Sequence, residues 1–231
     1  MWTDSQGKSL SDYPRPSVAV DVAVLTVVST EGPGQLSVLL HKPDEGFAAG
    51  KWCLPGTFVH QHELLADAAL RALRDKVGVS GQQPRQLKVF DALARDERGR
   101  VLSVAHVDVV PEGHFFVSGV SWTLAPVVGE RAQLPGRQNR LPFDHDQIVA
   151  EAVAWVRSAH LRRPDPFQLL GRDFTLSDLQ KLHEAVAGER LVKDTFRRGV
   201  LPALAATGRE RTGTVGRPAA LYRRRSRPPR A

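Results

Sequence analysis

A short polar and basic segment around residue 195 has the side chains needed to bind a polyanion. Lys193, Thr195, Arg197 and Arg198 stand near the beginning of a predicted helix. Lysine and arginine neutralise phosphates, and an arginine fork can also bind the edge of a guanine through two hydrogen bonds. Consecutive helical residues are about 100° apart around the axis, so Arg197 and Arg198 point in different directions. One of them can contact a base while the other contacts a phosphate, and the sequence leaves both assignments open.

The excess positive charge of the chain is confined to its last third. The 231 residues include 32 Lys and Arg against 25 Asp and Glu, a formal net charge of +7. Residues 165–231 contain 14 basic and 7 acidic residues, whereas residues 1–164 contain 18 of each. A solvated basic tail could account for Arg223 to Arg230 taken alone. The segment as a whole also has a helical pattern, which favours a polyanion as its partner.

The elements predicted for residues 165–231 follow the order of a winged helix-turn-helix domain. Thr175 can cap a first helix, whose apolar residues recur at helical spacing as far as Val186. A break at Gly188 precedes a second helix, predicted from residue 194 or 195 through Leu204. Three glycines between residues 207 and 222 then indicate a β-hairpin, the wing.

In a winged helix the second helix enters the major groove of duplex DNA, and its N-terminal residues reach the bases. Arginines of the wing can contact phosphate or the adjacent minor groove, and polar residues at the start of the first helix can contact phosphate. The expected DNA-contacting residues are Thr175, Ser177, Lys193, Thr195, Arg197, Arg198, Arg209, Arg211 and Arg217.

The first 160 residues predict an α/β sandwich, in which a mixed sheet is flanked by two helices. Apolar and β-branched runs at 17–28, 36–41, 87–93, 101–110 and 120–124 indicate strands, and residues 65–77 and 142–158 have helical periodicity. Gly78 can cap the first helix at its C-terminus. A charged, proline-containing stretch, Leu161–Pro166, marks the predicted boundary between domains 1–160 and 165–231.

Several classes of protein are disfavoured by composition. No stretch approaches the roughly 18 apolar residues of a membrane span, and residues 1–16 contain no apolar run of signal-peptide length. We therefore expect a cytoplasmic protein. Cys53 is the only cysteine, so it cannot form an intramolecular disulfide or contribute to a multi-cysteine zinc site.

Residues 55–79, PGTFVHQHELLADAALRALRDKVGV, resemble the Nudix box. Thr57 falls where the first glycine of that motif belongs, with Gly56 beside it. The matching residues are Glu63, Arg71, Leu73, Gly78 and Val79. The resemblance implies a Nudix-like fold for this domain.

The three glutamates of the box that bind the metal are replaced in this chain. Nudix enzymes present glutamates at the positions occupied here by Ala72, Asp75 and Lys76, which share one helix face. Three carboxylates there hold Mg²⁺ against a pyrophosphate and polarise a water molecule. In this chain the three residues have a formal charge of zero, and Lys76 brings a cation to the place of the metal. We therefore expect no metal site and no hydrolase activity.

The resemblance extends over residues 17–225, to Nudix-related transcriptional regulators of NAD metabolism. It is carried by ARDERGRVLSVAH at 94–106, LPFDH at 141–145, FTLSDLQ at 174–180 and, most specifically, GRPAALYR at 216–223. It implies a homodimer on a palindromic DNA operator, repression or activation of NAD biosynthesis or salvage genes, and ADP-ribose or a related NAD-derived nucleotide as effector. No cofactor is required, and loss of the catalytic carboxylates suits a sensor that must release its nucleotide intact.

Four cations near the motif are candidates for the diphosphate of that effector: Arg71, Lys76, Arg95 and Arg98. Phe90 or Trp52 could stack on adenine. Two alternatives stay open at this point. One is a divergent Nudix pyrophosphohydrolase acting on ADP-ribose-like substrates. The other is a nucleotide sensor whose basic domain binds RNA or protein, although the basic segment lacks the interleaved aromatic residues that stack on single strands.

Overall fold

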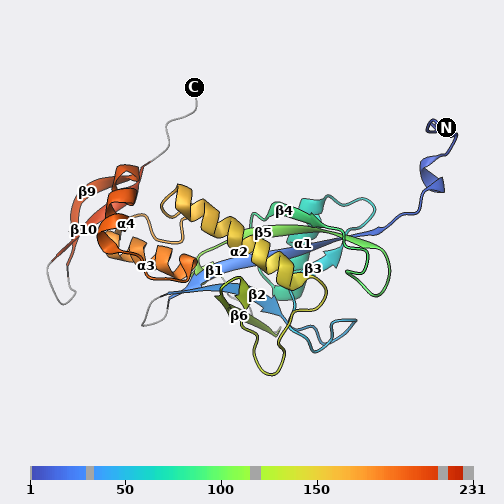
Figure 1. The fold of residues 1–231 in the computed structure, drawn as a ribbon, viewed down its shortest axis with the longest axis horizontal. Coiled ribbons are helices and arrows are strands. Elements are labelled where there is room, and N and C mark those ends of the chain that lie inside the picture. Colours follow the sequence, from blue (N-terminus) through green and yellow to red (C-terminus); the bar gives the residue numbers. More distant parts are fainter. Residues whose placement is uncertain (1, 30–33, 115–120, 213–217, 226–231) are drawn as a thin grey trace.

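The computed structural model describes residues 2–29, 34–114, 121–212 and 218–225. Its larger part is built on a seven-stranded sheet with the order β4-β5-β1-β2-β6-β7, in which β3 also pairs with β1. The sheet is mixed, because β1 runs parallel to β5 and antiparallel to β2 and β3. A three-stranded sheet of order β8-β10-β9 belongs to the C-terminal part (Figure 1). The predicted α/β sandwich with a mixed sheet is confirmed.

The strands are β1 (Ser17–Val28), β2 (Gln35–His41), β3 (Gly56–Phe58), β4 (Arg85–Phe90), β5 (Val101–Val109), β6 (Trp122–Val128), β7 (Arg131–Ala132), β8 (Phe174–Thr175), β9 (Leu204–Arg211) and β10 (Ala219–Arg224). The helices are α1 (Leu65–Val77), α2 (His145–Arg162), α3 (Leu176–Ala187) and α4 (Lys193–Val200). Three 3-10 turns cover Leu10–Asp12, Glu112–His114 and Leu201–Ala203. No helix in the described ranges is both long enough and apolar enough to cross a membrane.

Strand β1 lies inside the sheet and is buried on both faces, which explains its nearly continuous apolar sequence. Alternate side chains of a strand point to opposite faces. Val20, Val22 and Val24 pack in one cluster with α1. Ala23 and Leu25 belong to a second cluster, which contains the buried side chains of α2. Asp21 lies on the same side of the strand as Ala23 and is also buried.

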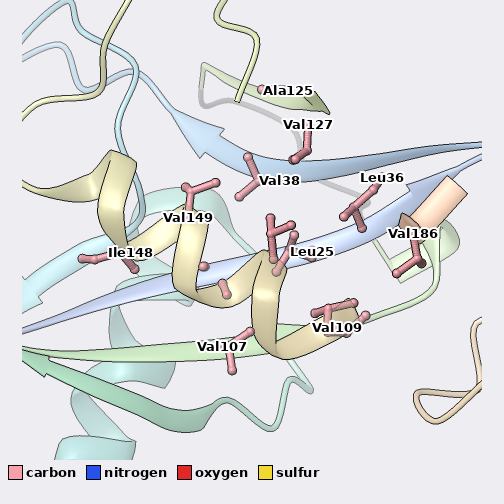
Figure 2. Close-up of a cluster of buried hydrophobic side chains, with 14 of the residues drawn as sticks. Leu25, Leu36, Val38, Val107, Val109, Ala125, Val127, Ile148, Val149 and Val186 are labelled. Carbon is pink, nitrogen blue, oxygen red and sulfur yellow. The ribbon is translucent and has the colours of Figure 1, made fainter. Parts of the chain in front are cut away.

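Helix α2 crosses the sheet and supplies the centre of the larger core (Figure 1). Its residues Ile148 and Val149 are fully buried and lie among side chains of β1, β2 and β5 (Figure 2). Among these are Leu25, Val38 and Val107, which the sheet brings from three separate strands. Burying side chains of this size stabilises the fold by about 1.5–3 kcal/mol each relative to solvent exposure.

The C-terminal part has the predicted winged-helix order. The Thr175 hydroxyl accepts a hydrogen bond from the Asp178 amide at 3.1 Å, and the Asp178 carboxylate accepts one from the Thr175 amide at 2.9 Å. This reciprocal capping box starts α3 at the predicted residue. Gly188, with a φ of 79°, ends the helix in the left-handed conformation. Strands β9 and β10 then form the wing hairpin.

Several element boundaries differ from the sequence expectation. Helix α4 ends at Val200 rather than Leu204. Pro202 lies inside the predicted helix and opposes its continuation, since proline has no backbone N–H. Helix α2 begins at His145 rather than Pro142, after Phe143 adopts a φ of 56°, and it ends at Arg162 rather than Ser158. The short strands β3 and β8 were not expected, because two or three residues are too few to show an alternating pattern.

The winged helix packs directly on the sheet domain. Leu179 and Val186 of α3 are buried in the same cluster as Leu25. Arg157 of α2 donates from Nε to the carbonyl of Val186 at 3.0 Å and from Nη2 to the carbonyl of Gly129 at 2.7 Å. One guanidinium therefore joins α2 to α3 and to the turn after β6.

The first prediction concerns the start of α3. Thr175→Ala removes the capping hydroxyl and should lower the free energy of unfolding by about 1–2 kcal/mol. Ser177 is exposed, so Ser177→Ala should change stability by less than about 0.5 kcal/mol. Urea denaturation followed by circular dichroism measures both. Equal stabilities for the two variants would contradict the capping role.

Candidate functional site

A cavity of about 250 Å³ lies where the N-terminus of α2 meets β1, β3 and the end of α1. Three of the four cations predicted to bind the effector line it: Lys76, Arg95 and Arg98. Its other lining groups include Asp21 and Phe47, together with His145 at the first position of α2. The predicted stacking residues, Phe90 and Trp52, are not among them.

A network of buried charges forms the inner wall of this cavity. Arg95, whose side chain is 3% exposed, donates two hydrogen bonds to Asp144, at 2.8 and 2.7 Å, and a third to Asp21 at 3.2 Å. Ser103 also donates to Asp21, at 2.6 Å. Asp144 is the N-cap residue of α2, so the network attaches the start of this helix to the central strand.

His145 completes the network, and its proton can be placed. The Leu54 amide donates to Nδ1 at 3.1 Å, so Nδ1 is an acceptor and the proton lies on Nε2, 3.3 Å from the Asp21 carboxylate. Burial by itself would raise the pKa of Asp21, but His145, Ser103 and Arg95 together lower that pKa to about 2. Asp21 is therefore a carboxylate at every pH at which the protein is expected to work.

Gly56 of β3 lies against the same carboxylate. A Cβ at this position would come within 2.1 Å of the Asp21 Oδ1 atom and 3.0 Å of the Val20 carbonyl. Only glycine fits here without displacing Asp21, which gives this part of the Nudix-like motif a structural reason.

Arg98 stands at the mouth of the cavity among three aromatic rings. Its guanidinium carbon lies 5.2 Å from the ring centres of Phe47 and Phe58 and 5.5 Å from that of Phe143. Asp96 receives two hydrogen bonds from Arg98, at 2.9 and 2.7 Å. The three rings supply apolar surfaces that a nucleobase or ribose could contact. They come from separate loops and strands, so no local pattern in the sequence indicated them.

His41 and Cys53 form the floor and are uncharged. Their side chains are 3.3 Å apart, from Nε2 to Sγ. Burial, with smaller contributions from Lys76 and His145, lowers the pKa of His41 to about 4. Burial raises the pKa of Cys53 to about 12. A neutral imidazole and a protonated thiol leave this floor without a reactive nucleophile.

The fourth predicted effector residue, Arg71, lies outside the cavity lining. Both Glu63 oxygens accept hydrogen bonds from it, at 2.7 and 2.8 Å, and Thr57 Oγ1 and the Phe58 carbonyl accept two more. The hydrogen bonds that Glu63 accepts from Arg71, together with one from the His60 amide, lower the pKa of Glu63 to about 2. Arg71 therefore ties together the loop and the helix of the Nudix-like motif.

The residues at the metal-binding positions of the motif do not fit a divalent cation. Ala72 offers no ligand, and Asp75 is 48% exposed and pairs with Arg74 at 2.9 Å. Both oxygens of Glu63 are already occupied by Arg71. Within the described ranges no three His, Cys, Asp or Glu residues come together in a way that could hold a metal ion.

The second candidate site is the outer face of α4. Lys193, Thr195, Arg197 and Arg198 are all exposed, while Phe196 packs against the core and Val200 is buried. Among the ion pairs of the described residues, none involves Lys193, Arg197 or Arg198. The helix therefore presents exposed cations without a carboxylate partner among the described residues, although the Arg198 Nε atom donates to the Asp194 carbonyl at 3.3 Å. The DNA contacts expected of these residues stay a prediction.

Arg209 and Arg211 of the wing are paired with carboxylates of their own domain. Asp173 pairs with both Arg209 and Arg223, and Asp178 pairs with Arg211 at 2.9 Å. To contact a DNA phosphate, Arg209 or Arg211 would have to leave its carboxylate partner, so that the phosphate takes the place of the carboxylate. The prediction that they contact DNA therefore stays a prediction.

The remaining predicted DNA contacts divide into three cases. Thr175 is buried, and its hydroxyl caps α3. Ser177 is exposed near the start of that helix. Arg217 lies outside the described residues.

Comparison with known proteins places this arrangement in a family. Residues 19–168 match the NUDIX domain, and residues 166–224 match the NrtR DNA-binding winged helix domain. An "ADPR responsive transcriptional repressor NtrR" of Acinetobacter baylyi is 29% identical over 92% of this chain and 84% of its own length. A crystal structure of Shewanella oneidensis NrtR complexed with a 27mer DNA is 30% identical and covers 90% of this chain and 93% of its own, with a TM-score of 0.71.

The chain belongs to the NrtR family. The expected Nudix-like domain followed by a winged helix is confirmed. An ADP-ribose pyrophosphatase of Methanocaldococcus jannaschii is 28% identical over 62% of this chain and 76% of its own length. The larger domain of this chain is thus similar to a hydrolase as well, which makes the residues at the motif positions important for assigning a function.

The second prediction tests the buried network behind the cavity. Asp21→Asn leaves Arg95 with one carboxylate fewer and should lower the free energy of unfolding at pH 7 by about 3–5 kcal/mol, as expected for breaking a buried pair. The lowered pKa of Asp21 means that its contribution is complete above its ordinary value of 3.8 and is lost as the pH falls toward 2. The variant should therefore show a smaller loss of stability between pH 4 and pH 2.

Denaturant unfolding at several pH values measures this effect. Asp44→Asn serves as the control, because Asp44 is exposed. If Asp21→Asn had the same stability at pH 7 and the same acid sensitivity as the unmodified protein, the role of Asp21 as the ionised, buried partner of Arg95 would be contradicted.

Proposed function

We propose that this protein is a DNA-binding transcriptional repressor of NAD biosynthesis or salvage genes that responds to ADP-ribose or a related nucleotide. The observation that carries the proposal is the group of exposed cations on α4, Lys193, Arg197 and Arg198, which form no ion pair with the described residues. They lie within a domain matched to the NrtR DNA-binding winged helix. The solved NrtR relative that is 30% identical was crystallised with DNA. In this arrangement α4 enters the major groove, with Arg197 and Arg198 dividing base and phosphate contacts.

The cavity supports a nucleotide as the effector. Lys76 offers positive charge, whereas that of Arg98 is balanced by Asp96. The rings of Phe47, Phe58 and Phe143 offer apolar surfaces. A nucleotide diphosphate with a base or ribose needs both kinds of group. The relative from Acinetobacter baylyi is named as responsive to ADPR, which supports ADP-ribose over other nucleotides.

Helix α2 offers a route from the cavity to the DNA-binding domain. Its first residue, His145, lines the cavity, and Arg157 near its other end donates a hydrogen bond to α3. A nucleotide that favours one position of α2 would thereby favour one position of the winged helix. In a cytoplasmic homodimer, this would change the fit of two such domains to operator half-sites about 34 Å apart.

Hydrolysis of an ADP-ribose-like substrate is the second candidate function, because a curated pyrophosphatase is among the relatives. The geometry supports a non-enzymatic role instead. Ala72 carries no carboxylate, Asp75 points to solvent with Arg74, and Lys76 is a cation. Magnesium-dependent turnover of ADP-ribose by the purified chain would support the hydrolase and contradict this assignment.

The third prediction is sequence-selective binding to duplex DNA that changes with ADP-ribose. Binding to promoters of NAD biosynthesis genes should be measured with and without ADP-ribose over a salt series. Each phosphate contact should contribute about −0.9 to the slope of log affinity against log salt concentration. Binding that is independent of sequence, or unaffected by ADP-ribose, would contradict the proposal.

The fourth prediction separates α4 from charge in general. Arg197→Ala and Arg198→Ala should each weaken operator binding, and the variant that has lost a base contact should lose about 1–3 kcal/mol of discrimination between sequences. Arg131→Ala, which removes a cation on β7 in the sheet domain, should leave DNA binding unchanged. An equal loss in all three variants would show that binding follows net charge rather than α4.

A further inference from the structure

We propose that Lys76 replaces the divalent cation of a Nudix site, so that this protein binds the diphosphate of its nucleotide effector without a metal ion. The inference rests on the proposed function, because it assumes that the effector is a nucleotide with a diphosphate. It adds to that function a specific residue and a metal-independent mode of binding.

The first step is that the carboxylates needed to hold a metal are absent or engaged. Magnesium requires several oxygen ligands in near-octahedral geometry at about 2.0–2.1 Å. The side chain at position 72 is a buried methyl group. Glu63 is fully engaged with Arg71, and Asp75 pairs with Arg74 at the exposed side of α1. A metal held by the diphosphate would thus lack its usual protein ligands here.

The positive charges that line the cavity differ in how far nearby carboxylates compensate them. Arg95 is compensated by Asp21 and Asp144, and the charge of Arg98 is compensated by Asp96, which accepts hydrogen bonds from its Nε and Nη2 atoms. Lys76 is the third cation of the lining, and no carboxylate of the described residues forms an ion pair with it. Glu45 also lines the cavity, but it is exposed and forms none of these ion pairs. Lys76 is therefore the cation with positive charge to spare for an anionic ligand.

The third step concerns where the ammonium group acts. Lys76 is in the last turn of α1 and lines the same cavity as His41 and Cys53. Its positive charge adds to the effect of burial in lowering the pKa of His41 and opposes the rise that burial causes in the pKa of Cys53. The electrostatic effect of Lys76 therefore reaches the floor of the cavity. An ammonium group has three donors and serves as a compact point charge for phosphate. It can neutralise a diphosphate, but it cannot activate a water molecule as a metal does.

The experiment is a titration of the full chain with ADP-ribose by calorimetry, once in EDTA and once in millimolar Mg²⁺. We expect the same affinity in both within about twofold. Lys76→Met should weaken binding in EDTA by about 10- to 100-fold, the equivalent of one hydrogen bond to a charged group. Arg74→Met is the matched control on the same helix. It should bind like the unmodified protein, because Arg74 is exposed and lies outside the cavity.

A second variant, Lys76→Glu, restores one carboxylate at the motif position. It should bind ADP-ribose poorly in EDTA, with Mg²⁺ recovering part of the affinity. Thermal unfolding of each variant checks that it is folded, which the exposed position of Lys76 favours.

The outcomes separate this inference from the proposed function. Binding of ADP-ribose only when Mg²⁺ is present would overturn the role of Lys76 and leave the proposed function intact. The same holds if Lys76→Met binds normally in EDTA. Failure of the unmodified chain to bind ADP-ribose under either condition would overturn the proposed effector itself.

Discussion

A guanidinium buried between two carboxylates positions the other parts of this molecule. Arg95 joins Asp144, at the start of α2, to Asp21 in the central strand. Charges in a protein interior are tolerated when each has its partners, and removing one partner leaves the others without compensation. The same contact builds the wall of the cavity and fixes the N-terminus of the helix that crosses the sheet. The cavity wall and the position of α2 therefore depend on one set of hydrogen bonds.

Helix α2 contacts both candidate sites of the molecule. One end forms part of the cavity wall, and the other end packs on α3. There the rings of His160 and His183 are arranged edge to face, with 5.3 Å between the ring centres. Residues of the sheet, α2, α3 and the wing share one continuous apolar cluster. Close-packed cores transmit small displacements rather than absorbing them. A ligand that changes the position of α2 is therefore expected to act on the winged helix without a separate connecting element.

The sequence predicted what depends on local pattern. The apolar run of β1, the Gly78 cap and the Thr175 capping position are all found at the expected residues. The end of α4 could have been placed correctly from Pro202. The sequence contained one sign of the buried network, the carboxylate of Asp21 inside an apolar strand. The other members of the network are Arg95, Ser103, Asp144 and His145, which lie far from Asp21 in the sequence. Such contacts depend on how distant segments pack, as do the three rings around Arg98. The short strand β8 exists only because β10 pairs with it.

Amide hydrogen exchange of the full chain, with and without ADP-ribose, tests most directly whether the nucleotide cavity and the winged helix are coupled through α2. The account predicts changed exchange in the segments around the cavity and, in addition, along the second half of α2 and in α3. Changes confined to the cavity segments, with α2 beyond its first turn and α3 unaltered, would contradict it. Local stability reported by exchange is the appropriate quantity, because coupling through a packed helix need not produce a large displacement.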